Sequence, residues 1–284
     1  STKVHQAVER FEGQYKRYFV KQNIRHNGEK NIRDAKPRVV LVRGLGLLGV
    51  GQSLKSARIA ADLATVNIDI ITDAEAIGHY SPANQAEIFD IEYWSPETTK
   101  LSRAEPLPME GRIALITGAG SGIGAATAKA FADQGAVVIA VDVNKISAEM
   151  VAKSVGGLGL YCDVTKPKDV RRVFNTACKA YGGVDIVVSN AGAAWQGEIG
   201  SVDEVVIRKS FELNFFAHQS VAQNAVRVMR AQNFGGCLLF NASKQAVNPG
   251  PDFGPYGLPK AATLFLMRQY AVDHGKDGIT SNAV

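Results

Sequence analysis

The stretch Ile113-Ala114-Leu115-Ile116-Thr117-Gly118-Ala119-Gly120-Ser121-Gly122-Ile123-Gly124 decides the fold of this chain. It starts as an apolar run typical of a buried strand, passes through a glycine-rich turn and enters a helical pattern over residues 125–133. Gly118 permits a tight turn, Gly122 lets the backbone approach a pyrophosphate, and Gly124 lets the helix pack close to the strand. A helix N-terminus there offers unpaired N–H groups to an anion. We therefore expect a dinucleotide to be bound by Gly118, Ser121, Gly122, Ile123 and Gly124.

The composition is that of an ordinary globular protein. Of 284 residues, 46% are hydrophobic and 21% are charged, which excludes disordered and collagen-like chains. The net charge of +5 arises in residues 1–40, which hold ten Lys/Arg against four Asp/Glu. We interpret this segment as a solvated surface and expect no nucleic-acid partner.

Cysteine usage and hydropathy bear on the compartment. Cys162, Cys178 and Cys237 are far apart and odd in number, which fits a reducing compartment and no metal site. No apolar run approaches the roughly 18 residues of a membrane span, and the start lacks a signal-peptide pattern. We expect a cytoplasmic protein without membrane association.

After Gly111, six apolar runs alternate with helix-length segments. Strands without polar alternation, separated by helices, are typical of a parallel sheet covered on both faces. The sequence thus predicts an α/β fold, a doubly wound parallel sheet of the Rossmann type, with a smaller N-terminal α/β segment. The six runs are residues 113–116, 137–141, 158–161, 186–189, 237–240 and 279–284.

The N-terminal part has a different organisation. A β-branched strand is expected at 38–43, helices at 53–67 and about 84–93, and a further strand-like run at 66–71. The proline-punctuated segment 101–111 has no periodicity. We place the boundary there, so that residues 1–100 form one part, residues 101–111 a linker, and residues 112–284 a nucleotide-binding domain.

A second glycine pattern, Gly44-Leu45-Gly46-Leu47-Leu48-Gly49, also matches G-x-G-x-x-G after a strand and before a helix. The strand-like run that follows carries Asp69 in its interior rather than an acid at its end, and polar turn residues are missing between Leu45 and Val50. We interpret this pattern as a structural turn and not as a second nucleotide site.

Asp142 closes the second strand of the main domain, 18 residues after Gly124. A carboxylate there can accept hydrogen bonds from both hydroxyls of the adenosine ribose and would repel a 2′-phosphate. Ser121 and Val143, at the places where a basic residue would bind that phosphate, are uncharged. We therefore expect NAD rather than NADP; the alternative for Asp142 is a strand-end surface acid.

Two further strand ends carry candidate cofactor contacts. Asp163 follows the third strand, where its carboxylate can take the adenine amino group while Val164 flanks the ring. Asn190-Ala191-Gly192 follows the fourth strand, where small residues let the backbone pass close to a flat cofactor and the Asn side chain can join neighbouring strands. Each alone also fits an ordinary turn.

The candidate catalytic residues are Tyr256 and Lys260, four apart on a segment, 256–273, that reads as a helix despite Pro259. This spacing puts both side chains on one face. Lowering the pKa of a phenol by two to three units requires roughly 3–4 kcal/mol of anion stabilisation, which an ammonium and a positive nicotinamide can supply. Ser243, 13 residues earlier, offers a hydroxyl for the substrate oxygen, and Asn214 can pass protons through a bound water.

Each of these four residues also has a purely structural interpretation. Tyr256 is then half-buried packing, Lys260 a solvated helix face, Ser243 a helix cap, and Asn214 a buried polar residue satisfied by backbone. Their occurrence in this order behind a nucleotide-binding motif favours catalysis.

Thr117-Gly118-x-x-x-Gly122-x-Gly124, Asn190-Ala191-Gly192, Asn214, Ser243 and Tyr256-x-x-x-Lys260 together resemble the classical short-chain dehydrogenases/reductases over residues 112–284. The resemblance implies that Tyr256 is the general acid/base, that Lys260 lowers its pKa and binds the nicotinamide ribose, and that Tyr256 also lies against the cofactor. It implies that Ser243 orients the substrate and that Asn214 maintains a proton relay. It also implies a homo-oligomer, a dimer or tetramer formed through the helices that carry Asn214 and Tyr256.

A narrower resemblance concerns the N-terminal part. Residues 37–51 and Phe89-Asp90-Ile91-Glu92-Tyr93-Trp94-Ser95 resemble the end of a class II aldolase domain, which precedes the dehydrogenase in bifunctional rhamnulose-phosphate aldolase/short-chain dehydrogenases. Residues 241–244 and 248–251 also resemble that subgroup. The five histidines are isolated, so we expect neither a metal site nor aldolase activity. The chain begins without Met and ends on a strand at Val284, and we expect a fragment whose dehydrogenase domain is C-terminally incomplete.

The function expected is an NAD-dependent oxidoreductase that transfers a hydride between nicotinamide and a small alcohol or carbonyl substrate. The subgroup resemblance points to lactaldehyde or a related sugar-derived hydroxyaldehyde. The alternative is a non-catalytic NAD-binding sensor or scaffold module.

Overall fold

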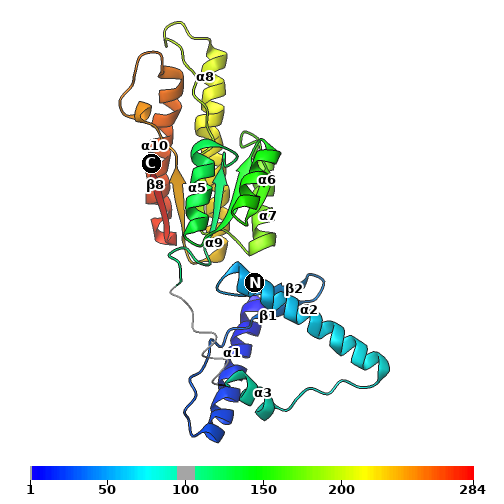
Figure 1. The fold of residues 1–284 in the computed structure, drawn as a ribbon. Coiled ribbons are helices and arrows are strands. Elements are labelled where there is room, and N and C mark those ends of the chain that lie inside the picture. The colour runs from blue at the N-terminus through cyan, green and yellow to red at the C-terminus, as the bar shows by residue number, and fades with distance from the viewer. Residues whose placement is uncertain (1, 95–105) are drawn as a thin grey trace. The chain divides into compact units, whose positions relative to one another are not determined.

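The computed structural model describes residues 2–94 and 106–284, which form two compact units, Ser1–Pro106 and Leu107–Val284 (Figure 1). Residues 101–105 of the expected linker lie outside the described part of the chain. Its remaining residues, 106–111, lead directly into the first strand of the second unit.

The second unit alternates strands and helices along its whole length. Its elements are β3 (Ile113–Thr117), α5 (Gly122–Asp133), β4 (Val137–Asp142), α6 (Lys145–Ser154), β5 (Leu158–Tyr161), α7 (Pro167–Tyr181), β6 (Ile186–Ser189), α8 (Glu204–Phe211), a π-helical turn (Glu212–Phe216), α9 (Ala217–Gln232), β7 (Gly236–Phe240), a 3₁₀ turn (Lys244–Ala246), α10 (Gly254–His274), a 3₁₀ turn (Gly275–Asp277) and β8 (Ile279–Ala283).

All six predicted apolar runs form strands of one sheet in the order β5-β4-β3-β6-β7-β8. Every neighbouring pair is parallel. The strand order reverses between β3 and β6, so the crossovers after β3 and after β6 leave on opposite faces, and a crevice opens where they diverge. The predicted doubly wound α/β fold is confirmed.

Two apolar cores cover the two faces of this sheet. On one face α5 and α6 pack through Ala128 and Ala152 against Ile116 and Val138. On the other face α7 and α9 pack through large side chains such as Phe174 and Met229, and α10 adds Tyr270. The central strands β3, β4 and β6 are thus buried on both sides, which is why they show no polar alternation (Figure 1).

The first unit holds α1 (Thr2–Asn23), a 3₁₀ turn (Ile24–His26), β1 (Val39–Val42), β2 (Gly46–Gly49), α2 (Leu54–Ile77) and α3 (Gln85–Glu92). Its buried centre is aromatic: Phe19 of α1 packs against Phe89 and Tyr93, whose rings stack with centroids 4.4 Å apart. Asn84 caps α3 through a capping box with Glu87, as expected for a helix near residues 84–93.

The second glycine pattern forms a hairpin. β1 and β2 pair antiparallel from Val39↔Gly49 to Val42↔Gly46, and Gly44 has a φ of 77° in the connecting turn. A Cβ on Gly49 would collide with the carbonyl oxygen of Ala57 in α2. The glycines therefore serve a tight turn and a close helix approach, in agreement with the structural interpretation.

One prediction in this unit is wrong. The run 66–71 is not a strand, because α2 continues through it to Ile77 instead of ending near Asn67. Ser53 starts the helix with a capping box to Ser56, and β-branched residues cost a helix only about half a kcal/mol each. The hairpin is the one sheet described in this unit and does not pair with these residues, so the helix is not interrupted.

Candidate active site

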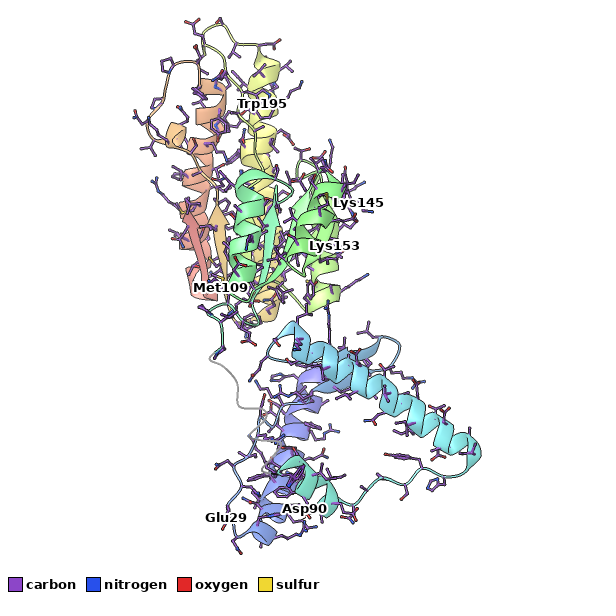
Figure 2. The ribbon with its side chains drawn as sticks, viewed as in Figure 1. Glu29, Asp90, Met109, Lys145, Lys153 and Trp195 are labelled. Carbon is purple, nitrogen blue, oxygen red and sulfur yellow. The ribbon has the colours of Figure 1, made fainter. Side chains whose placement is uncertain are left out.

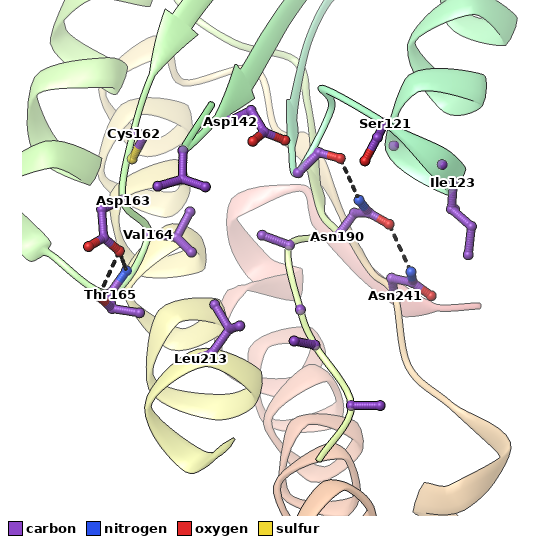
Figure 3. Close-up of a pocket in the computed structure, with 18 of the residues that line it drawn as sticks. Ser121, Ile123, Asp142, Cys162, Asp163, Val164, Thr165, Asn190, Leu213 and Asn241 are labelled. Atoms are coloured by element: carbon purple, nitrogen blue, oxygen red, sulfur yellow. Dashed lines mark hydrogen bonds between the residues drawn. The ribbon is translucent and has the colours of Figure 1, made fainter. Parts of the chain in front are cut away.

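A cleft of about 690 Å³ lies at the carboxyl ends of β3, β4, β5 and β6 (Figure 3). It brings together every residue expected to contact the cofactor, although they come from five separate segments of sequence. Its lining includes Gly118, Ser121, Gly122, Ile123, Gly124, Asp142, Asp163, Val164, Asn190, Ala191, Gly192, Tyr256 and Lys260.

The glycine turn leaves the start of α5 open. The helix begins at Gly122, earlier than the expected residue 125, and no side chain caps it. Its first N–H groups therefore have no intrahelical acceptor. Gly118 and Gly122 have φ of 64° and 52°, and a Cβ on Gly124 would collide with the carbonyl oxygen of Gly118. This arrangement presents backbone donors to an anion.

Asp142 lies beside the turn that precedes this helix start. Its Oδ2 accepts a hydrogen bond from Gly120 N at 2.9 Å, and its Oδ1 accepts one from Asn144 N at 2.9 Å. Each oxygen keeps a lone pair for a further donor. The carboxylate is thus fixed in orientation while it remains able to accept two ribose hydroxyls.

Asp163 is held by its own turn. Its Oδ1 accepts hydrogen bonds from the backbone and the hydroxyl of Thr165, at 3.0 and 2.6 Å (Figure 3). Val164 and Cys162 line the cleft beside it. Burial raises the pKa of Cys162 to about 12, so the thiol stays protonated and adds an apolar wall. The pocket end here is flat and apolar with one carboxylate at its rim.

Asn190 joins neighbouring strands, as the sequence suggested. Its Nδ2 donates to the carbonyl oxygens of Thr117 and Gly118 at 2.9 and 3.2 Å, and its Oδ1 accepts from Asn241 Nδ2 at 2.8 Å (Figure 3). The Thr117 hydroxyl accepts from the N–H groups of Asn190 and Ala191. This network fixes the ends of β3, β6 and β7 relative to one another.

Tyr256 and Lys260 lie in the first two turns of α10, with Pro259 between them. Pro259 lies inside the helix, which continues through it although proline has no backbone N–H to donate. The Lys260 Nζ is 5.9 Å from the centre of the Tyr256 ring. The Tyr256 hydroxyl has no hydrogen bond to any described residue, and both side chains line the cleft.

Lys260 is not the solvated side chain of the structural interpretation. It is 2% exposed, and its Nζ donates to the carbonyl oxygen of Asn241 at 2.7 Å. Burial lowers its pKa to about 8, so the ammonium form prevails at neutral pH.

Asn214 lies in the π-helical turn between α8 and α9, a distortion common at functional sites. It does not line the cleft. Its side chain holds the loop after β6, because Oδ1 accepts from Ala193 N at 3.2 Å and Nδ2 donates to Ala193 O at 2.8 Å. Its own carbonyl oxygen accepts from the Thr263 hydroxyl at 2.7 Å.

Ser243 caps the 3₁₀ turn Lys244–Ala246, and its Oγ accepts from Gln245 N at 3.2 Å. It is not among the residues that line the cleft. A hydroxyl that accepts a hydrogen bond still has its own hydrogen to donate. Ser243 thus caps the turn, as the structural interpretation expected. Its hydroxyl can still donate a hydrogen bond to a substrate oxygen.

Sequence reasoning missed several residues that shape the site. Thr165 and Asn241 line the cleft and hold Asp163 and Lys260, and His218, buried on α9, approaches Lys260. Strand-end position was a usable signal for the first two. None was available for His218, because only the packing of α9 against α10 brings it near the lysine.

The described residues contain no group of three or more His, Cys, Asp or Glu side chains arranged to hold a metal ion. Within the same residues, no helix is long and apolar enough to cross a membrane. All three cysteines are unpaired.

Comparison with known families agrees with this geometry. Residues 112–284 match the family model described as short chain dehydrogenase, and residues 1–101 match the model of the second domain of class II aldolases. A short-chain type dehydrogenase/reductase from Mycobacterium marinum superimposes with a TM-score of 0.60 at 30% identity, over 62% of this chain and 72% of that one.

Among curated proteins, the uncharacterized oxidoreductase YuxG of Bacillus subtilis is 33% identical over 99% of this chain and 42% of its own length. Short chain aldehyde dehydrogenase 1 of Euphorbia lathyris is 35% identical over 62% of this chain and 63% of its own length. The chain thus spans less than two thirds of either relative. The match to the family model covers more than half of the chain, so this protein belongs to the short-chain dehydrogenase family of oxidoreductases.

Proposed function

We propose that the protein transfers a hydride between NAD and a small alcohol or carbonyl compound. The observation that carries the proposal is that the unpartnered hydroxyl of Tyr256 and the buried ammonium of Lys260 line the same cleft as the open start of α5 and Asp142. Nucleotide-binding and proton-transferring groups thus share one site.

The residues present fit a nicotinamide dinucleotide. The glycine turn leaves no room for Cβ atoms at Gly118 and Gly124, and the helix start offers N–H groups to a pyrophosphate. Asp142 keeps two acceptors for ribose hydroxyls, and the rim near Asp163 and Val164 suits an adenine ring.

The charges along the cleft favour NAD over NADP. Among the described residues that line it, Lys260 is the only cation, and it lies at the end with Tyr256. Lys145 (labelled in Figure 2) begins α6, three residues after Asp142. It is paired with Glu149 at 3.6 Å and does not line the cleft. A 2′-phosphate would therefore meet the carboxylate of Asp142 without a cation to offset it.

When bound, the nicotinamide accepts or supplies the hydride. The protein's part is the proton: in the oxidation direction, the Tyr256 phenolate takes the proton of the substrate hydroxyl as the C–H bond breaks. The Lys260 ammonium stabilises that phenolate. Ser243 donates a hydrogen bond to the substrate oxygen, and Asn214 supports a bound water through which the proton leaves.

The chain's two matches support a larger proposal about the whole protein. We infer that it is the dehydrogenase part of a bifunctional aldolase/dehydrogenase of the rhamnulose-phosphate type, cytoplasmic and homo-oligomeric through α9 and α10. The alignment with the Bacillus oxidoreductase runs through both units. The product of such an aldolase is a short hydroxyaldehyde, which makes lactaldehyde the first substrate to test.

The test uses the full-length protein with a panel of short polyols and hydroxyaldehydes. NAD turnover with a member of the panel, lost in Tyr256→Phe while calorimetry still shows NAD binding, is the expected result. Undiminished turnover in Tyr256→Phe would contradict the mechanism. NAD binding without turnover across the panel would instead favour a sensor or scaffold module.

A further inference from the structure

A buried histidine forms part of the surroundings of Lys260 and has no role in the mechanism above. His218 lies on α9, one helical turn after Asn214, and is 1% exposed. Its Nε2 is 3.4 Å from Lys260 Nζ, and its Nδ1 is 2.6 Å from the hydroxyl of Ser189. The imidazole thus bridges the candidate catalytic lysine and the end of β6.

The charge state of this imidazole follows from its surroundings. Burial, and then the positive charge of Lys260, lower the pKa of His218 to about 3. The ionisable groups facing Lys260 are His218 and Tyr256, and the charged group facing His218 is Lys260. The proton shared by this pair therefore stays on the lysine, and His218 is a neutral hydrogen-bonding group at working pH.

The donors of the ammonium can be assigned one by one. Lys260 has three N–H groups. One donates to the carbonyl oxygen of Asn241 at 2.7 Å, and a second points to His218 Nε2 at 3.4 Å. The third is left for the cleft, which Lys260 lines together with Tyr256.

We propose that His218 is a positioning residue for Lys260, because its Nε2 accepts a hydrogen bond from the ammonium. The imidazole proton is then on Nδ1, which donates to the hydroxyl oxygen of Ser189. Two fixed acceptors, Asn241 O and His218 Nε2, then aim the third N–H into the cleft. This inference rests on the proposed function, because it concerns how Lys260 supports Tyr256.

Ser189 makes the arrangement adjustable. When Lys260 is charged, His218 must accept at Nε2, so Nδ1 carries the proton and donates to Ser189 Oγ. When Lys260 is neutral, its lone pair can accept from Nε2–H, and the serine hydroxyl can donate to Nδ1. A serine serves both cases because a hydroxyl is both donor and acceptor.

Loss of the imidazole has a predictable effect on the pH profile. In His218→Leu the ammonium loses one acceptor, so its charged form is less stable and less well placed beside Tyr256. The less stable ammonium supports the Tyr256 phenolate less well. We therefore expect the acid limb of kcat/KM for alcohol oxidation, which reports the deprotonation of Tyr256, to move to higher pH by about one unit, a tenfold change in its acid dissociation constant. His218→Gln restores an acceptor near the Nε2 position and is expected to recover at least half of that shift.

Val221→Ala is the matched control. Val221 is also buried on α9, 2% exposed, but has no polar contact with Lys260. It should lower Tm without moving the acid limb. If His218→Leu moves the acid limb no more than Val221→Ala does at similar loss of Tm, His218 is a packing residue and the proposal is wrong.

A second measurement does not depend on activity. In the full-length protein labelled with ¹⁵N-histidine, with His218→Gln identifying the signal, His218 at pH 6 should be neutral with its proton on Nδ1. A histidine that titrates near 6.5, or that carries its proton on Nε2, overturns the proposal. If Tyr256→Phe retains turnover, the proposed function fails; if only the His218 results disagree, the proposed function stands and this inference fails.

Discussion

Asp142 and Gly120 fix each other at the rim of the cleft. The carboxylate accepts the N–H of Gly120 at 2.9 Å, and a Cβ on Gly120 would lie 2.9 Å from the same carboxylate. The glycine therefore both orients the acid and gives it space. We expect the preference of the site for NAD over NADP to depend on this contact.

The first prediction concerns cofactor preference. Asp142→Ala combined with Val143→Arg removes the carboxylate and adds a cation at a position that is 64% exposed and lines the cleft. We expect the ratio of kcat/KM for NAD to that for NADP to fall about 100-fold, because charge-assisted contacts to a phosphate are worth about 2–3 kcal/mol. Steady-state kinetics with both cofactors measures it.

Asp133→Ala serves as its control, since Asp133 is an exposed acid at the far end of α5, paired with Lys129. The ratio should not change in that variant. An unchanged ratio in the Asp142 variant as well would mean that this carboxylate does not select the cofactor.

A second prediction concerns the turn before α5. In Gly124→Ala the added methyl group would collide with the backbone of Gly118 and lie 2.7 Å from Asn190 Nδ2. The turn must open, so we expect NAD affinity to fall more than tenfold and the free energy of unfolding to drop by about 1–3 kcal/mol. Gly200→Ala, where nothing lies within 4 Å of the new Cβ, should change neither. Calorimetry and urea unfolding report both quantities.

The third prediction concerns the link between strands β6 and β7. Asn190 and Asn241 share a 2.8 Å hydrogen bond in a half-buried position. We expect each single alanine variant to lose about 1–3 kcal/mol of unfolding free energy, with a coupling of about 1 kcal/mol in the double-mutant cycle. Urea unfolding of the four proteins provides the values. Strictly additive losses would show that the contact does not join the strands.

The sequence predicted the second unit far better than the first. The run 186–189 coincides with β6, because a strand buried on both faces leaves an unbroken apolar signal. In the first unit α2 buries none of its described side chains. Its Val and Ile residues therefore carry no burial pattern. The alternation of apolar and polar residues over 66–71 predicted a strand where the chain is helical.

The cleft was predictable for a related reason. Strand ends can be read from sequence, and parallel strands bring their ends to one edge, so the amino-acid pattern alone places Asp142, Asp163 and Asn190 together. The position of His218 cannot be predicted in this way. It lies on α9, 42 residues from Lys260, and only the packing of α9 against α10 brings it within reach.

The last prediction follows from the burial of Lys260 and concerns stability. Its pKa is lowered to about 8 in the folded protein, against 10.5 for an ordinary lysine. Between these values the unfolded chain binds more protons than the folded one, so the free energy of unfolding rises with pH. The cost of burying the charge is thus fully present below pH 8 and is lost as the pH approaches 10.5.

Lys260→Met removes this cost at every pH, together with the ammonium that we propose stabilises the Tyr256 phenolate. We expect the variant to be inactive, and its stability relative to the unmodified protein to fall by about 3 kcal/mol between pH 8 and pH 10.5. Urea unfolding at several pH values measures the difference, in which the titration of other groups cancels. Lys129→Met, a substitution at a lysine that is 70% exposed, should show no such slope. A difference for Lys260→Met that is equally flat with pH would mean that the buried lysine titrates as it does in the unfolded chain.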